Sequence, residues 1–422
     1  MKRKQILLMF IFAIATSAMI FQGCKKDDEP KDLTLATLLA GTVDLNGATS
    51  PNTVPVDASI VATFSTDIDA ATVSAANIKL TQDYDNTDVQ INITASGKTM
   101  TITPVSELGT GTLYKLSFSG AIMSTDAKPL TAFDRTFTTI GTFAPTGAIA
   151  HWNFEDNAND IIGTYNSSAA IDVAYVAGRN ASAGKAASFN GTTSIIEIPN
   201  GDVLMTTPNF TISFWVKAKS EGQVNENGDP KGHFVMGLGA FYGFQFEIFG
   251  GYDGAKFAIQ YGFENGQSGA EDMWFPALAT DASNGGWQGW DFAKSLTAEQ
   301  MIAKLKDNWL HVTYTYDGTA KKGTLYYDSE KMKSFDFNLW PEGDLKRTVT
   351  GMKYAGTAPD VVNELAFGFV QSRAGTMWDA EPWGGYDIAT ANHFRGQLDD
   401  VRIFHKVLTT TEIQLMYNSE KP

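Results

Sequence analysis

The feature that most constrains the fold of this chain is the alternation of apolar and polar residues in short runs. Side chains of a β-strand point to opposite faces in turn, so a period of two predicts strands with one buried face. In the first third of the chain such runs are separated by Gly, Asp and Asn; they are 59–64, 89–93, 99–103 and 114–118. Their regular spacing predicts a β-sandwich of about seven strands.

A second series of strand-like runs follows a Gly/Thr/Pro connector at 141–147. The runs are 148–154, 187–191, 194–198, 210–217, 309–318, 323–328 and 394–404. Pattern and position alone predict no more than a second β-sandwich. Two helices are also predicted, because Thr297 with Gln300 and Thr409 with Glu412 have the spacing of capping boxes.

Each series of runs resembles a known protein family. Residues 64–72, 126–130 and 135–139 resemble a bacterial Ig-like domain, which is often a spacer in surface proteins. The second series, in its order, resembles a LamG-like jelly roll of the concanavalin A-like superfamily, most specifically at Asp399-Asp400-Val401-Arg402-Ile403-Phe404. The resemblances imply an all-β chain. An Ig-like β-sandwich at 41–141 would precede a larger concanavalin A-like jelly-roll sandwich at 145–422.

The N-terminus has the features of an export signal. A basic start, Met1 to Lys4, precedes a short apolar run, and small residues lead to a break at Gly23. The apolar run is shorter than the roughly 20 residues that a membrane-spanning helix needs. Residues 1–23 are therefore predicted to be a signal peptide that is removed from the mature protein.

Cys24 is the only cysteine, so it cannot form an intramolecular disulfide. Its place after Phe21-Gln22-Gly23 resembles a bacterial lipobox, in which the cysteine is lipidated, although Phe21 and Gln22 depart from the usual pattern. Residues 25–29 (Lys-Lys-Asp-Asp-Glu) resemble the lipoprotein export signal of glycan-scavenging gram-negative bacteria. The resemblance implies an outer-membrane protein anchored by lipid, facing the cell exterior, with an acidic tether over 24–40.

The charge balance restricts the partners. The chain has a formal net charge of −15, and removal of Lys2, Arg3 and Lys4 with the signal changes it to −18 (−15 − 3). Such an acidic chain is not expected to bind nucleic acid, whose phosphates need Lys and Arg. Calcium and neutral or cationic ligands are compatible with this charge.

Tryptophans are concentrated in the parts of the second sandwich that exceed a jelly-roll core. Trp152, Trp215 and Trp309 fall on predicted core strands and are assigned to packing. The insertions hold the others, Trp274, Trp287, Trp290, Trp340, Trp378 and Trp383. Indole rings stack on the apolar faces of sugars, so these six are the predicted carbohydrate-binding residues. The alternative is that long loops use aromatic residues to fill small cores of their own.

Calcium is the candidate cofactor, in a structural role. Two oxygen-rich clusters suit a hard cation, one formed by Glu155, Asp156 and Asp160 and the other by Asp399 and Asp400. In LamG-like jelly rolls the first and last strands are neighbours, so the resemblance implies that the clusters meet at one site. The alternative is that they are solvated acidic turns.

No catalytic motif is recognisable in the sequence. There is no Glu-x-Asp-x-x-Glu run of the kind that concanavalin-like glycoside hydrolases carry, and the five histidines lack metal-ligand spacing. We therefore predict a non-catalytic surface lipoprotein that captures a polysaccharide or other glycan. The alternatives are a protein-binding adhesin or assembly component with a surface protein partner, and a glycoside hydrolase or lyase with an unrecognised site.

Overall fold

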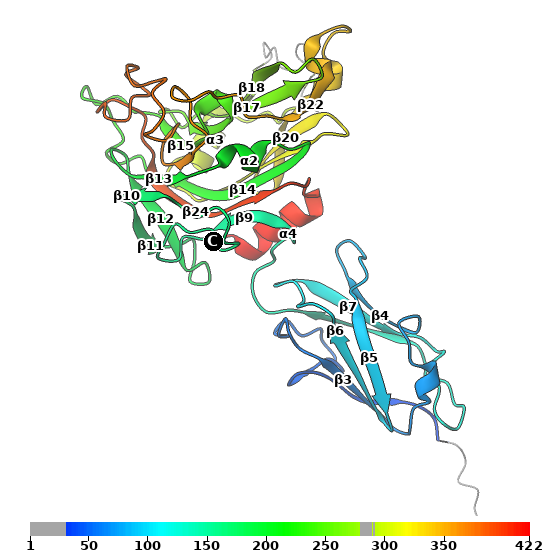
Figure 1. Cartoon of the computed structure of the whole chain (residues 1–422). Coiled ribbons are helices and arrows are strands. Elements are labelled where there is room, and N and C mark those ends of the chain that lie inside the picture. Colours follow the sequence, from blue (N-terminus) through cyan, green and yellow to red (C-terminus); the bar gives the residue numbers. More distant parts are fainter. Residues whose placement is uncertain (1–30, 279–288, 290–291) are drawn as a thin grey trace, which may run out of the picture. The chain divides into compact units, whose positions relative to one another are not determined.

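The computed structural model describes residues 31–278, 289 and 292–422. The chain divides into two compact units, residues 1–141 and 142–422, which are described separately (Figure 1). The regular structure of both units is mainly antiparallel β-strand, as predicted. Within the described residues, no helix is both long and apolar enough to cross a membrane.

The first unit is a β-sandwich of two antiparallel sheets. The five-stranded sheet has the order β2 (Val43–Asp44), β1 (Leu35–Ala40), β3 (Ile60–Phe64), β6 (Thr99–Pro104), β5 (Ile91–Ser96). The other sheet has the order β4 (Ile78–Gln82), β7 (Leu113–Phe118), β8 (Phe133–Thr138). Alternate residues of β3 and β7 are buried, and one hydrophobic cluster joins side chains from both sheets. The predicted Ig-like sandwich is therefore confirmed in its architecture.

The second unit contains two larger antiparallel sheets. The first, called the β17 sheet, has the order β10 (Ala169–Ile171), β13 (Ile195–Ile198), β23 (Leu365–Phe367), β15 (His233–Gly237), β16 (Phe244–Ile248), β17 (Ala255–Phe263), β18 (Ser268–Phe275), and β22 (Val349–Met352) also pairs with β17.

The second, called the β24 sheet, has the order β11 (Ala174–Ala177), β12 (Lys185–Asn190), β24 (Arg395–Phe404), β14 (Asn209–Ala218), β19 (Leu310–Asp317), β20 (Lys322–Tyr327), β21 (Glu330–Asp336). Strand β9 (Ala148–Trp152) pairs with the second half of β24. The first and last strands of this unit are therefore neighbours, as the resemblance to a LamG-like jelly roll implied.

Alternation along β14 shows how the core is built. Phe210, Phe214 and Val216 point into the large cluster between the two sheets. The intervening Ser213 and Trp215 point to the opposite side, which we call the outer face of the β24 sheet, yet they too are buried. The outer face is therefore covered at this position by another element.

The helices are few and short: α2 (Gly201–Met205), α3 (Ala298–Leu305), α4 (Thr410–Glu420) and the 3-10 turns η1 (Ala70–Thr72), η2 (Ala240–Tyr242), η4 (Phe337–Leu339) and η5 (Leu345–Thr348). Both predicted capping boxes are confirmed. Thr297 caps α3 with Gln300, and Thr409 caps α4 with Glu412.

Helix α4 is the element that covers the outer face of the β24 sheet (Figure 1). Tyr417 stacks on the indole of Trp215, with 5.8 Å between the ring centroids, and the Sδ atom of Met416 lies 3.9 Å from Ser213 Oγ. Trp152 and Trp215 are fully buried, as their assignment to packing predicted, whereas Trp309 is half-buried just before β19.

Buried histidines give this unit a pH dependence. Burial lowers the pKa of His233 and of His311 to about 3, and that of His393 to about 4. In the unfolded chain a histidine takes up its proton near pH 6.5, so each one destabilises the fold progressively as the pH falls below that value. The effect is about 1.4 kcal/mol per pH unit for each group.

We predict that the stability difference between the wild-type protein and a His311→Gln variant narrows by about 1.4 kcal/mol when the pH is lowered from 6 to 5. The variant has no imidazole to protonate in its unfolded state, so it escapes this part of the acid destabilisation. Urea unfolding at the two pH values measures the difference. An equal difference at both pH values would contradict a neutral, buried His311.

Candidate functional site

The predicted tryptophans do not form one surface. Trp287 and Trp290 lie outside the described residues. Trp274 was expected in a loop but lies on strand β18, where its side chain is 47% exposed. Its indole ring packs beside Phe249, with 5.2 Å between centroids, and the ammonium of Lys256 lies 5.1 Å from the ring. Trp274 therefore keeps an accessible ring at the edge of the β17 sheet.

The other three described tryptophans occupy two separate places. Trp340 is half-buried, and the ammonium of Lys346 lies 3.8 Å from its ring. Trp378 is only 6% exposed and belongs to a small cluster beside the β17 sheet, whereas Trp383, 6.4 Å away between centroids, is 40% exposed. Trp378 therefore fills a small local core, as the alternative interpretation of the tryptophans predicted, whereas Trp274 and Trp383 remain accessible to a ligand.

The first predicted acidic cluster binds the backbone of its own loop. The carboxylate of Asp160 accepts hydrogen bonds from the backbone amides of His151, Ile162, Thr164 and Tyr165, at 2.8–3.1 Å. Glu155 accepts one from the amide of Lys185, and Asp156 pairs with the ammonium of that lysine. These contacts hold the loop after β9 against the β11–β12 hairpin.

The second predicted cluster is bound by arginine. Arg179 places one guanidinium nitrogen 2.5 Å from Asp399 Oδ2 and another 2.7 Å from Asp400 Oδ2. Arg402 lies 2.9 Å from Asp400 Oδ1 and 2.7 Å from Glu420 Oε1, at the end of α4. We call Arg179, Asp399, Asp400, Arg402 and Glu420 the buried ion cluster. Trp215 Nε1 also donates to Glu420 Oε2, at 2.8 Å.

Burial governs the electrostatics of this cluster. Burial and the adjacent charge of Asp400 raise the pKa of Asp399. Burial also acts to raise the pKa of Asp400, but the charges of Arg402 and Arg179 and the hydrogen bond from His151 lower it. Burial also raises the pKa of Glu420, so the three carboxyl groups depend on the two arginines to hold their charge.

This arrangement does not fit the calcium site that the sequence suggested. Calcium takes 6–8 oxygen ligands, but the oxygens of Asp399 and Asp400 face guanidinium groups, whose charge would repel a cation. Across the described residues, no group of three or more His, Cys, Asp or Glu side chains is placed to hold a metal ion. The physical reason is that Arg402, two residues after Asp400, and Arg179, which is distant in sequence, supply the positive charge.

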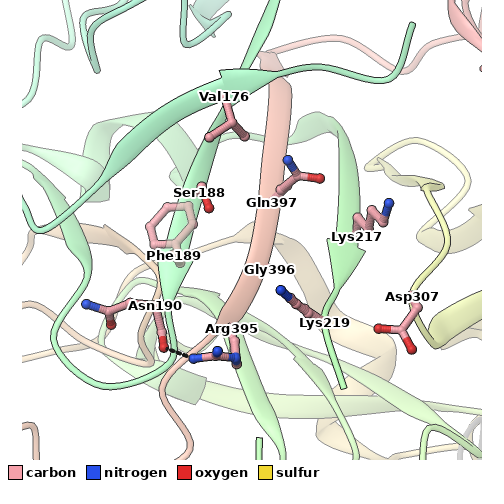
Figure 2. A pocket seen from close by; sticks show the side chains of 10 residues that line it. All are labelled: Val176, Ser188, Phe189, Asn190, Lys217, Lys219, Asp307, Arg395, Gly396 and Gln397. Carbon is pink, nitrogen blue, oxygen red and sulfur yellow. Dashed lines mark hydrogen bonds between the residues drawn. The ribbon is translucent and has the colours of Figure 1, made fainter. Parts of the chain in front are cut away.

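A pocket of about 620 Å³ lies on the same outer face (Figure 2). It begins at the pair Lys217 and Gln397, two residues along their strands from the pair Trp215 and Asp399. Two rows of side chains cross neighbouring strands there. Ser188 on β12, Gln397 on β24 and Lys217 on β14 are register partners, and we call them the open row. Neighbouring strands lie about 4.8 Å apart, so this row extends across roughly 10 Å.

The second row, which we call the braced row, consists of Asn190, Arg395 and Lys219. Arg395 donates to the carbonyl oxygens of Asn190, at 2.6 Å, and Glu221, at 2.7 Å. Lys219 lies 3.5 Å from the Glu221 carboxylate, and the Asn190 side chain accepts hydrogen bonds from the turn at 192–194. The braced row is therefore held by the protein itself.

The open row has different surroundings. Among the described residues, the side chains of Ser188, Gln397 and Lys217 form no hydrogen bond and no ion pair within 4.0 Å. Two further residues also line the pocket. Val176 lies on β11, the strand next to the one that carries Ser188, and Asp307 lies just after α3. The open row thus presents a hydroxyl, an amide and an ammonium, which can recognise a ligand rich in oxygen atoms.

Sequence reasoning missed this pocket, although part of it lies directly before the segment Asp399–Phe404 that was considered most specific. Arg395 and Gln397 precede Asp399 at alternate positions of β24, and Lys217 ends the apolar alternation of β14. Polar residues at alternate positions of a strand that is otherwise buried were the available signal. What the sequence did not contain was the register that aligns Ser188, Gln397 and Lys217.

Comparison with known proteins identifies the first unit. Residues 41–139 match the family model of the bacterial Ig-like domain. No curated protein is similar enough in sequence to count as a match.

Solved structures similar to the chain have low TM-scores. The receptor-binding domain of botulinum neurotoxin type G has a TM-score of 0.37 and 15% identity, over 65% of this chain and 51% of its own. The binding domain of paraclostridial mosquitocidal protein 1 has a TM-score of 0.40 and 16% identity, over 65% of this chain and 52% of its own. The ligand-binding domain of botulinum neurotoxin serotype D, in complex with N-acetylneuraminic acid, has a TM-score of 0.39 and 14% identity, over 65% of this chain and 51% of its own. These matches span about half of those chains, and likeness this low says nothing about what this chain binds.

We predict that Arg179→Met lowers the free energy of unfolding by about 3–5 kcal/mol, because it leaves Asp399 and Asp400 buried without their shared partner. Lys185→Met is the matched control. It removes the exposed pair with Asp156 and is expected to cost about 0–1 kcal/mol. Equal costs for the two variants, or a melting temperature that calcium raises in the wild type but not in Asp399→Asn, would contradict the role given to Arg179.

Proposed function

We propose that this protein is a lipid-anchored protein of the bacterial cell surface that binds carbohydrate, without turning it over, through the pocket on the outer face of its LamG-like second unit. The observation that carries the proposal is the open row. Three polar side chains that form no hydrogen bond and no close ion pair with any described residue line one hollow on a rigid sheet, and a few such polar groups fix the orientation of a ligand in small-molecule and sugar sites. The Ig-like unit would serve as a spacer between membrane and pocket.

The rigidity of the site supports binding of a preorganised kind. Gln397 and Lys217 lie on β24 and β14, which pair over most of their lengths, and the braced row fixes the loops beside them. Because the backbone of the sheet is already fixed, a ligand has to order only the side chains, whereas a mobile loop would also have to be ordered. Weak individual contacts then suffice, particularly when a lipid anchor concentrates many copies on one surface.

Trp274 and Trp383 have a secondary place in the proposal. Their exposed rings offer stacking surfaces for a longer glycan chain, as the sequence suggested. Neither lines the pocket. We therefore assign the primary contacts to the open row and accessory contacts to these two rings.

We predict that the mature protein, tested against a panel of neutral and acidic polysaccharides, retains at least one class and releases no products from it. A Ser188→Ala/Gln397→Ala double variant should bind that class about tenfold more weakly, since each hydrogen bond contributes about 0.5–1.5 kcal/mol. The control is Gln90→Ala, at an exposed site of the first unit. Affinity electrophoresis gives retention, and a reducing-end assay gives turnover.

The other outcomes of this experiment separate the rival functions. If no polysaccharide is retained, carbohydrate binding is wrong and a protein-binding adhesin becomes the leading account. If reducing ends accumulate, the protein is an enzyme. If retention depends on Trp274 or Trp383 and not on the open row, the pocket is not the binding site.

The proposed anchoring has a separate test. Cys24 is the only cysteine, so metabolic labelling with a fatty acid should mark the wild-type protein and not a Cys24→Ser variant. The variant should also leave the membrane fraction, because its only proposed covalent lipid site is lost. Equal labelling of the two proteins would contradict lipidation at Cys24.

A further inference from the structure

The charge of the pocket is opposite to the charge of the chain. The full sequence has a formal net charge of −15, yet Lys217, Lys219 and Arg395 line the pocket against one carboxylate, that of Asp307. Three cations and one anion give the lining a formal charge of +2 (3 − 1). Clefts with one sign of charge concentrate ligands of the other sign. Composition alone suggested neutral or cationic ligands, and the local distribution reverses that expectation.

Partners within the protein account for most of these charges. Asp307 accepts hydrogen bonds from the backbone amide and hydroxyl of Ser220, at 2.8 and 2.7 Å. Although partial burial acts to raise it, these bonds lower the pKa of Asp307. Lys219 pairs with Glu221, and Arg395 is held by two carbonyl groups. Lys217 makes no hydrogen bond and no ion pair within 4.0 Å in the described part of the chain, although its charge also helps to lower the pKa of Asp307.

The charge of the polar side chains also changes across the strands of the sheet (Figure 2). Along the open row, Ser188 on β12 is neutral, Gln397 on β24 is neutral and bifunctional, and Lys217 on β14 is positive. A ligand lying along this row would meet hydroxyl-binding groups at one end and a cation at the other. An uncharged sugar would leave the Lys217 ammonium with only its longer-range interaction with Asp307, whereas a sugar with an acidic group would use every member of the row.

From these observations we infer that the pocket takes an acidic glycan, one whose sugars carry carboxylate or sulfate groups, with Lys217 binding the anionic group. The inference rests on the proposed carbohydrate-binding function and narrows its ligand class. Gln397 and Ser188 bind hydroxyls of the same sugar. In the braced row, Arg395 adds positive potential without direct contact being required, because its partners are uncharged carbonyl groups, whereas Glu221 offsets the charge of Lys219.

The test compares matched pairs of ligands. Polygalacturonate is set against its methyl ester, and dextran sulfate against dextran, so that each pair differs only in the anionic group. The mature wild-type protein is expected to bind the acidic member of at least one pair at least about tenfold more tightly than the neutral member, a difference of about 1.4 kcal/mol. Binding is also expected to weaken as salt is added, because salt screens exposed charges.

Variants locate the contact. Lys217→Met keeps an apolar stem without the charge and should lose the preference for the acidic member, whereas Lys217→Arg should keep it. Lys353→Met is the matched control, because Lys353 is a lysine of the same unit whose ammonium donates to the Gly266 carbonyl outside the pocket. Circular dichroism and the melting temperature establish that each variant is folded.

Each result bears on a different part of the account. Equal binding of the acidic and neutral members by the wild-type protein would overturn the inference and leave the proposed function in place. Preference for the acidic member that survives in Lys217→Met would overturn the role of this pocket. Absence of binding to all four polymers and to the whole polysaccharide panel would remove the proposed function and the inference together.

Discussion

The buried ion cluster is the interaction on which the second unit depends. Arg179 and Arg402 bridge three carboxyl groups from β24 and the end of α4, and Arg179 also lies 4.9 Å from the Trp215 ring. Charged groups this deeply buried are stable only when each has its partners. The cluster therefore fixes α4 over one half of the outer face of the β24 sheet and leaves the other half open as the pocket.

This division explains how one strand serves two purposes. At one end of β24, Asp399 and Arg402 are committed to stability; at the other, Arg395 and Gln397 line a hollow. Strand β9 pairs with the first of these ends and β12 with the second. A recognition surface on a sheet whose other face is a large aromatic core needs no backbone movement to form, which lowers the cost of ordering it when a ligand binds.

The sequence predicted the β-rich fold class and both capping boxes, because alternation and cap spacing are local patterns. The Ig-like unit and the pairing of the first and last strands were expected from resemblance to known families. The sequence did not predict that Arg179 pairs with Asp399 and Asp400, since Arg179 lies far away along the chain. For the same reason the alignment of Ser188, Gln397 and Lys217 could not be read from spacing. Long-range register and buried charge pairing come from the fold as a whole.

The central claim is that the open row contacts an acidic sugar. The most direct measurement is a crystal structure of the mature protein with a short oligogalacturonide. The account predicts a sugar ring lying over Ser188 and Gln397, with its carboxylate within hydrogen-bonding distance of Lys217. A ring bound instead on Trp274 or Trp383, with the pocket filled only by water, would contradict it.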